Sequence, residues 1–160
     1  MQSKVIYFSL LILFSSLFLG CAKDLKRNTV IPYTPIDTRI NLGWADYSDL
    51  NFPNRPVYIL YSTPAGKLLG YNGNGIIVMQ TALDEYKCYD ATCPKCIDAD
   101  THIEITAGEQ IARCPTCSTQ FFLPYGIPLD TEENENNDDK VSPLQVYPVE
   151  VAGSILIIRY

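Results

Sequence analysis

Short apolar segments alternate with turn-forming residues along most of this chain, and no segment repeats its apolar positions with a helical period. Residues 57–61 and 76–79 are apolar runs, and Asn72-Gly73 between them is a dipeptide typical of β-hairpins. Residues 85–91 alternate between polar and apolar, as a half-buried strand does. The pattern predicts an all-β fold, a small antiparallel barrel or sandwich.

Turn signals divide the rest of the chain in the same way. Residues 44–56 are expected to be irregular, because Pro53 and Pro56 interrupt any regular element. The length suits one domain, over residues 36–160. Further strands are expected over residues 38–42, 101–106, 110–113 and 120–123, with a closing hairpin of residues 143–151 and 155–160 around Ala152-Gly153.

The first 20 residues combine a positive charge with a short apolar run. Lys4 precedes an apolar run over residues 5–19, which is too short to span a bilayer comfortably. The run ends in Gly20-Cys21, as in a lipobox, where the cysteine becomes the lipidated first residue of the mature protein. An ordinary signal peptide and a short membrane anchor stay open as alternatives. The lipoprotein interpretation predicts a tether over residues 21–35 and an exported domain in the cell envelope, in the periplasm or at the cell surface.

The charge balance bears on the classes of partner. The chain carries 12 Lys and Arg residues against 18 Asp and Glu residues, for a net charge of −6, and it has no basic patch for nucleic acid. The sequence contains no Ser/His/Asp arrangement and no phosphate-binding glycine loop. These features favour an electron-transfer or binding module over a catalyst.

Two C-P-x-C motifs, Cys93 to Cys96 and Cys114 to Cys117, are separated by 17 residues. Each motif turns two thiolates towards one point, and four thiolates suit a tetrahedral zinc or iron site. An exported compartment is oxidising, so a metal-free domain with disulfides stays open. Cys88 lies in an alternating segment, where we expect a small buried side chain and not a ligand.

The stretch over residues 40–160 resembles the Rieske family of iron–sulfur domains. In that family two loops each give one cysteine and one histidine to a 2Fe-2S cluster. Cys93 and Cys114 match the two cysteines of the family, and Cys117 stands where the second histidine would be. Cys96 lies one residue beyond the position of the first histidine. The resemblance implies an electron carrier with a redox protein as its partner.

The ligand set departs from that family. His102 is the only histidine of the chain, so a centre with two histidine ligands cannot form within it. Thr119 matches a family serine whose hydroxyl can hydrogen-bond a cluster sulfur. Four thiolates would give a 2Fe-2S cluster a lower reduction potential than a Rieske centre has. The alternative is a single zinc or iron ion, and with zinc the site would be structural in a domain that binds some other partner.

Overall fold

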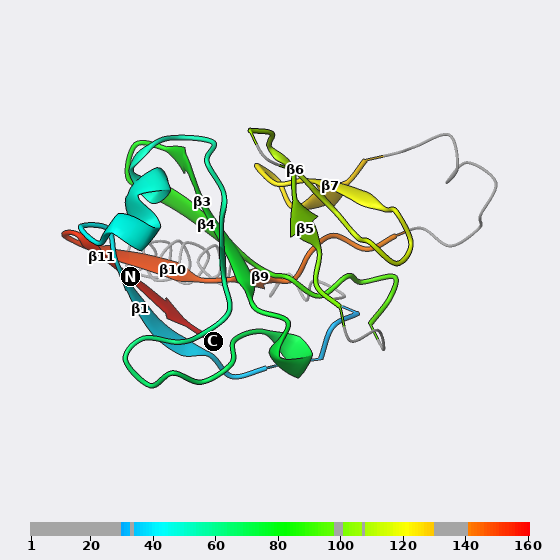
Figure 1. Ribbon diagram of the computed structural model, residues 1–160, viewed down its shortest axis with the longest axis horizontal. Helices are drawn as coiled ribbons and strands as arrows, with labels where there is room; N and C mark the ends of the chain where they lie inside the picture. Colours follow the sequence, from blue (N-terminus) through cyan, green and yellow to red (C-terminus); the bar gives the residue numbers. More distant parts are fainter. Residues whose placement is uncertain (1–29, 33, 98–100, 107, 130–140) are drawn as a thin grey trace, which may run out of the picture.

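The computed structural model describes residues 30–32, 34–97, 101–106, 108–129 and 141–160 (Figure 1). Its strands form three antiparallel sheets, of three, four and four strands. The expected all-β fold is therefore confirmed. The leader, Cys21 and most of the predicted tether lie outside the described residues, and none of the helices in the described part has the length and apolar character needed to span a bilayer.

The first sheet has the order β1-β11-β10 and lies on the left of Figure 1. It consists of β1 (Asp37–Asn41), β10 (Val149–Ala152) and β11 (Ile155–Arg159). The β10–β11 hairpin turns at Gly153, whose φ of 62° suits glycine. The closing hairpin predicted from the sequence is confirmed.

The second sheet has the order β2-β3-β4-β9 and occupies the middle of the fold. It consists of β2 (Val57–Ile59), β3 (Ile76–Ala82), β4 (Glu85–Asp90) and β9 (Val146–Tyr147). A separate apolar core covers each face of β3, so that Ile76 and Val78 face one core while Ile77 and Met79 face the other. Two covered faces explain why this strand is a continuous apolar run.

The third sheet has the order β5-β6-β7-β8 and lies on the right of Figure 1, away from β1, β10 and β11. Its strands are short: β5 (Glu104–Ile105), β6 (Ile111–Arg113), β7 (Gln120–Phe122) and β8 (Ile127–Pro128). Ala112 and Phe121 pack into the same core as Ile77 and Met79. This shared core joins the third sheet to the second.

Two expectations about local structure were wrong. The segment expected to be irregular contains a 3-10 helix, η2 (Ala45–Asn51), which buries Leu50 in the core of the first sheet. The Asn72-Gly73 pair does not connect two strands directly but lies in a short 3-10 turn, η3 (Tyr71–Gly73). Both residues have positive φ, 53° and 75°, so the dipeptide supplies the turn conformation within a longer loop.

Candidate metal centre

The four cysteines of the two C-P-x-C motifs converge at one point. The Sγ atoms of Cys93, Cys96, Cys114 and Cys117 all lie within 4.8 Å of one another. The Sγ atoms of Cys93 and Cys117 are 3.7 Å apart. Metal–sulfur bonds of about 2.3 Å in a tetrahedron place neighbouring sulfur atoms about 3.8 Å apart. The donor set therefore fits a single tetrahedral ion.

A two-iron cluster fits these separations less well. In such a cluster each iron binds two thiolates, and the second iron with the bridging sulfides separates the two pairs. The separations between thiolates on opposite irons are then longer than those on one iron. In this chain all the separations among the four sulfur atoms stay below 4.8 Å, which favours one ion at their centre.

The first cysteine loop follows directly from strand β4. The backbone N–H of Thr92 donates to Asp90 Oδ1 at 2.8 Å, which turns the chain out of the strand just before Cys93. The N–H of Cys96 donates to the carbonyl oxygen of Cys93 at 3.1 Å and closes the loop. The first two thiols are therefore presented by a turn at the end of the central sheet.

The second cysteine loop joins strands β6 and β7. The N–H of Cys114 donates to the carbonyl oxygen of Thr119, and the N–H of Ser118 donates to the carbonyl oxygen of Cys114, both at 2.9 Å. Ser118 has a φ of 61°, a left-handed conformation that turns the chain back into β7. The loop is thus closed by hydrogen bonds among its own residues.

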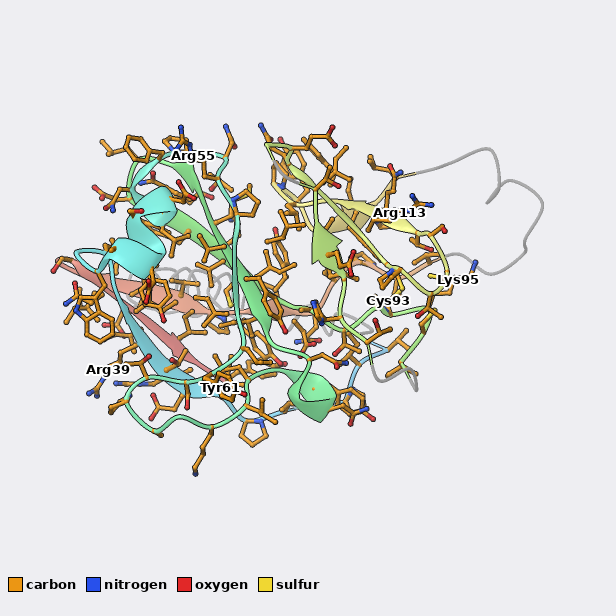
Figure 2. All side chains as sticks on the ribbon, in the orientation of Figure 1. Arg39, Arg55, Tyr61, Cys93, Lys95 and Arg113 are labelled. Atoms are coloured by element: carbon orange, nitrogen blue, oxygen red, sulfur yellow. The ribbon has the colours of Figure 1, made fainter. Side chains whose placement is uncertain are left out.

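Each loop contributes one buried and one partly exposed sulfur. Cys93 and Cys114 are fully buried, whereas Cys96 and Cys117 are of intermediate exposure. The buried pair packs into the core that the second and third sheets share. Figure 2 places Cys93 beside Lys95 at the right-hand edge of the molecule, far from Arg39 on the first sheet. The site therefore lies at one end of the domain, with a sulfur edge near solvent.

The thiols influence one another's protonation. Burial raises the pKa of the Cys93 thiol well above its usual value, and the neighbouring thiols Cys114 and Cys117 raise it further. Burial also raises the pKa of Cys96, to about 12, with hydrogen bonding to Cys117 adding to the shift. For Cys117, burial alone would raise the pKa, but hydrogen bonds from the Thr119 hydroxyl and backbone and from two neighbouring thiols lower it to about 7. The Cys117 thiolate is therefore stabilised next to Cys93 and Cys96, whose pKa values are raised.

Thr119 lies beside one of the four cysteine sulfur atoms. Its Oγ1 is 3.2 Å from Cys117 Sγ, and the residue is buried. When Cys117 is a thiolate, the hydroxyl is the donor of this hydrogen bond.

Two other residues singled out in the sequence lie outside the sulfur cluster. Cys88 is fully buried in the core against the first sheet, with its pKa raised well above the usual value by burial and by Asp90, and it does not belong to the sulfur cluster. His102 also lies outside the cluster and stacks on Tyr58, with ring centroids 4.5 Å apart.

The sequence reasoning missed the groups that support the first loop. Asp90 is completely buried, and its Oδ2 accepts a hydrogen bond from the hydroxyl of Tyr147 at 2.5 Å. Nothing in the local pattern of residues 85–91 distinguishes this aspartate from a solvent-exposed polar position of a strand. Its partner is 57 residues away in the sequence, so the contact emerges only in the folded chain.

No protein-family model and no curated protein matches the chain. Solved structures with which it shares a likeness include the ferredoxin of carbazole 1,9a-dioxygenase from Nocardioides aromaticivorans, at 17% identity and a TM-score of 0.41, over 79% of this chain and 97% of that one. Another contains the complex of reduced oxygenase and oxidised ferredoxin in carbazole 1,9a-dioxygenase, at 16% identity and a TM-score of 0.43, over 78% of this chain and 92% of that one.

A quaternary ammonium Rieske monooxygenase is similar at 16% identity and a TM-score of 0.49, over 81% of this chain and 32% of the longer one. At these TM-scores the superpositions are partial.

Proposed function

We propose that this chain is a membrane-anchored β domain in which four cysteines hold one metal ion. The observation that carries the proposal is the convergence of four sulfur atoms, from two loops, within 4.8 Å. A closed set of four thiolates leaves no open position on a tetrahedral ion, which is the arrangement of structural zinc sites. With zinc, the ion ties the end of the central sheet to the β6–β7 hairpin and fixes the surface that the domain offers to a partner.

A second function, electron transfer, is favoured by the exposure of the site. Cys96 and Cys117 reach the surface, whereas Cys93 and Cys114 are buried. Iron in the same tetrahedron could exchange one electron with a redox protein docked against the exposed sulfur edge. The Rieske-like pattern of the two loops supports the same function with a 2Fe-2S cluster, although the short sulfur separations favour a single ion.

Metal and sulfide analysis with a visible spectrum, on protein isolated without oxygen, separates these functions. One zinc per chain and no colour is the result expected for the structural site. One iron without sulfide, or two irons with two sulfides, would identify an electron carrier. Protein with no metal and two disulfides among the four cysteines would refute the metal centre. Cys88→Ala is the matched control, because it removes a buried thiol outside the cluster.

The membrane anchor is supported by the sequence of the leader alone. Lipidation at Cys21 would hold the domain to a bacterial membrane from outside the cytoplasm. We expect mass spectrometry of the mature chain to find a lipid-modified Cys21 at its N-terminus. Cys21→Ser should release the protein from the membrane fraction, and a variant that stays bound with an unmodified leader would indicate a simple membrane anchor instead.

A further inference from the structure

A buried carboxylate lies next to the first cysteine loop and receives three hydrogen bonds. Asp90 Oδ1 accepts from the backbone N–H of Thr92 at 2.8 Å. Its Oδ2 accepts from the backbone N–H of Tyr71 at 2.7 Å and from the hydroxyl of Tyr147 at 2.5 Å. Asp90 has no solvent exposure, and it forms no ion pair in the described part of the chain.

The chemistry of these partners matches an ionised carboxylate. A buried charge is costly unless it is well hydrogen-bonded, and charge-assisted hydrogen bonds are stronger than neutral ones. All three partners are donors, and an ionised carboxylate is a group that only accepts. An asparagine at this position would turn an N–H₂ group towards at least one of these donors. Burial and the charge of Asp90 raise the pKa of Tyr147, which keeps its hydroxyl a donor.

The three donors come from three separate segments of the chain. Tyr71 begins the η3 turn, Thr92 precedes Cys93, and Tyr147 belongs to strand β9. The side chain of Thr92 strengthens the link, because its Oγ1 donates to the carbonyl oxygen of Tyr71 and accepts from Asn74 Nδ2, both at 3.1 Å. The residue next to Cys93 is therefore held through its backbone and through its side chain.

We propose that Asp90 is the positioning residue of the metal centre. Through Thr92, it fixes where the first loop holds Cys93 and Cys96 relative to the two cysteines of the second loop. The proposal deepens the function proposed above and rests on it wherever it concerns metal affinity. That Asp90 orders the first loop does not depend on which metal binds.

Hydrogen exchange of the metal-free protein tests the first part. In Asp90→Asn we expect the amides of Thr92 and Cys96 to exchange about tenfold faster or more, relative to the amide of Ser118 in the second loop. Leu156→Ala is the matched control, because Leu156 is buried in the other core and its truncation lowers global stability. This control should leave unchanged the ratio of amide exchange rates between the first and the second loop. The same ratio in Asp90→Asn and in Leu156→Ala would overturn the proposal.

Cobalt(II) titration of the full domain tests the second part, with cobalt as a visible probe of tetrahedral thiolate coordination. Loss of groups that orient metal ligands typically weakens binding about 10- to 100-fold, and we expect Asp90→Asn to fall in this range. Its thiolate-to-cobalt absorption should also be altered, whereas Leu156→Ala should bind as the wild type does. Unchanged affinity and spectrum in Asp90→Asn would overturn the positioning role.

The two proposals can fail separately. Wild-type protein that binds no cobalt, zinc or iron would refute the proposed metal centre, and the exchange ratio would still decide whether Asp90 orders the first loop. If Asp90→Asn does not fold, Tyr147→Phe removes only one of the three donors and carries the same comparison. The expected change is then smaller but of the same sign, and no change in the exchange ratio would overturn the proposal.

Discussion

The two cysteine loops bring equivalent thiols to one point but are supported in different ways. The second loop is closed by its own backbone, through hydrogen bonds that join Cys114 to Ser118 and Thr119. Besides its own hydrogen bond between Cys96 and Cys93, the first loop depends on Asp90, whose partners Tyr71 and Tyr147 lie far away in the sequence. One loop is ordered locally, whereas the other is ordered only when the central sheet and its surroundings have formed.

This difference indicates where a metal ion would stabilise the fold. The β6–β7 hairpin holds its two thiols on a short, self-contained turn, while the first loop extends from the end of a central strand. An ion bound by both loops links a local element to the main core. Its binding energy then becomes part of the folding energy of the third sheet.

The largest expected effect is the loss of the ion when either loop loses one thiol. Cys93→Ala and Cys114→Ala should each lower the metal content from one ion per chain to nearly none, because a structural tetrahedral site needs all four ligands. Metal analysis after gel filtration measures the effect, with Cys88→Ala as the control that keeps its ion. Full metal content in either ligand variant would mean that three thiolates hold the ion, which would contradict a site that needs all four.

A smaller expected effect is a difference in stability between alanine variants of two glycines in the loop before the central strand. Gly70 has φ 75° and ψ 172°, a conformation nearly confined to glycine, and a Cβ there would collide with the carbonyl oxygen of Gly75. That oxygen accepts the N–H of Ala91, two residues before Cys93. Gly66 also has positive φ, but a Cβ there would meet no atom within 4 Å.

Gly66→Ala should cost about 1 kcal/mol of stability, from the left-handed conformation alone. We expect Gly70→Ala to cost about 1–3 kcal/mol more, because it also displaces backbone beneath the first loop. Urea unfolding of both variants measures the difference. Equal costs would mean that the first loop tolerates movement of this support, which would weaken the contrast between the loops.

The hydroxyl of Tyr147 should contribute to the free energy of unfolding in a way that depends on pH. At neutral pH, Tyr147→Phe should cost about 1–2 kcal/mol, because Asp90 loses one of its three donors. Burial, followed by the charge of Asp90, raises the pKa of Tyr147 in the folded state above 10, its ordinary value in the unfolded chain. A raised folded pKa gives a contribution to stability that is complete below pH 10 and is lost as the pH rises beyond it.

The stability difference between the wild type and Tyr147→Phe should therefore shrink above pH 10. Urea unfolding at pH 7 and at higher pH values measures it, with Tyr61→Phe as the control at an exposed position. A difference that stays constant across this range would contradict the raised pKa.

Much of the fold could be predicted from the sequence because apolar periodicity reports burial directly. The runs at residues 57–61, 76–79 and 85–91 all lie in or next to strands β2, β3 and β4. The helix η2 was missed because it is a short 3-10 element that buries only Leu50 and leaves no apolar period. The hairpin predicted at Asn72-Gly73 was wrong because the same positive φ angles occur in many kinds of turn.

In the candidate site, the metal ligands could be predicted from the sequence, whereas the residue that supports the first loop could not. The four cysteines were predictable because their spacing alone places two thiols on each turn. Asp90 was not, because its function depends on donors from η3 and β9 that only the folded chain brings together. Residues that bind directly leave a motif in the sequence, whereas residues that hold the binding loop in place leave none.

The smallest expected effect concerns the second loop. Thr119→Val removes the hydroxyl beside Cys117 Sγ but keeps the shape of a buried side chain. The backbone hydrogen bond between Cys114 and Thr119 does not involve that hydroxyl, so the loop should keep its conformation. Losing one hydrogen bond to a thiolate should weaken cobalt binding only about two- to fivefold, corresponding to about 0.5–1 kcal/mol. Thr119→Ser should restore it, and a loss as large as that of Asp90→Asn would mean that the second loop is not closed by its own backbone.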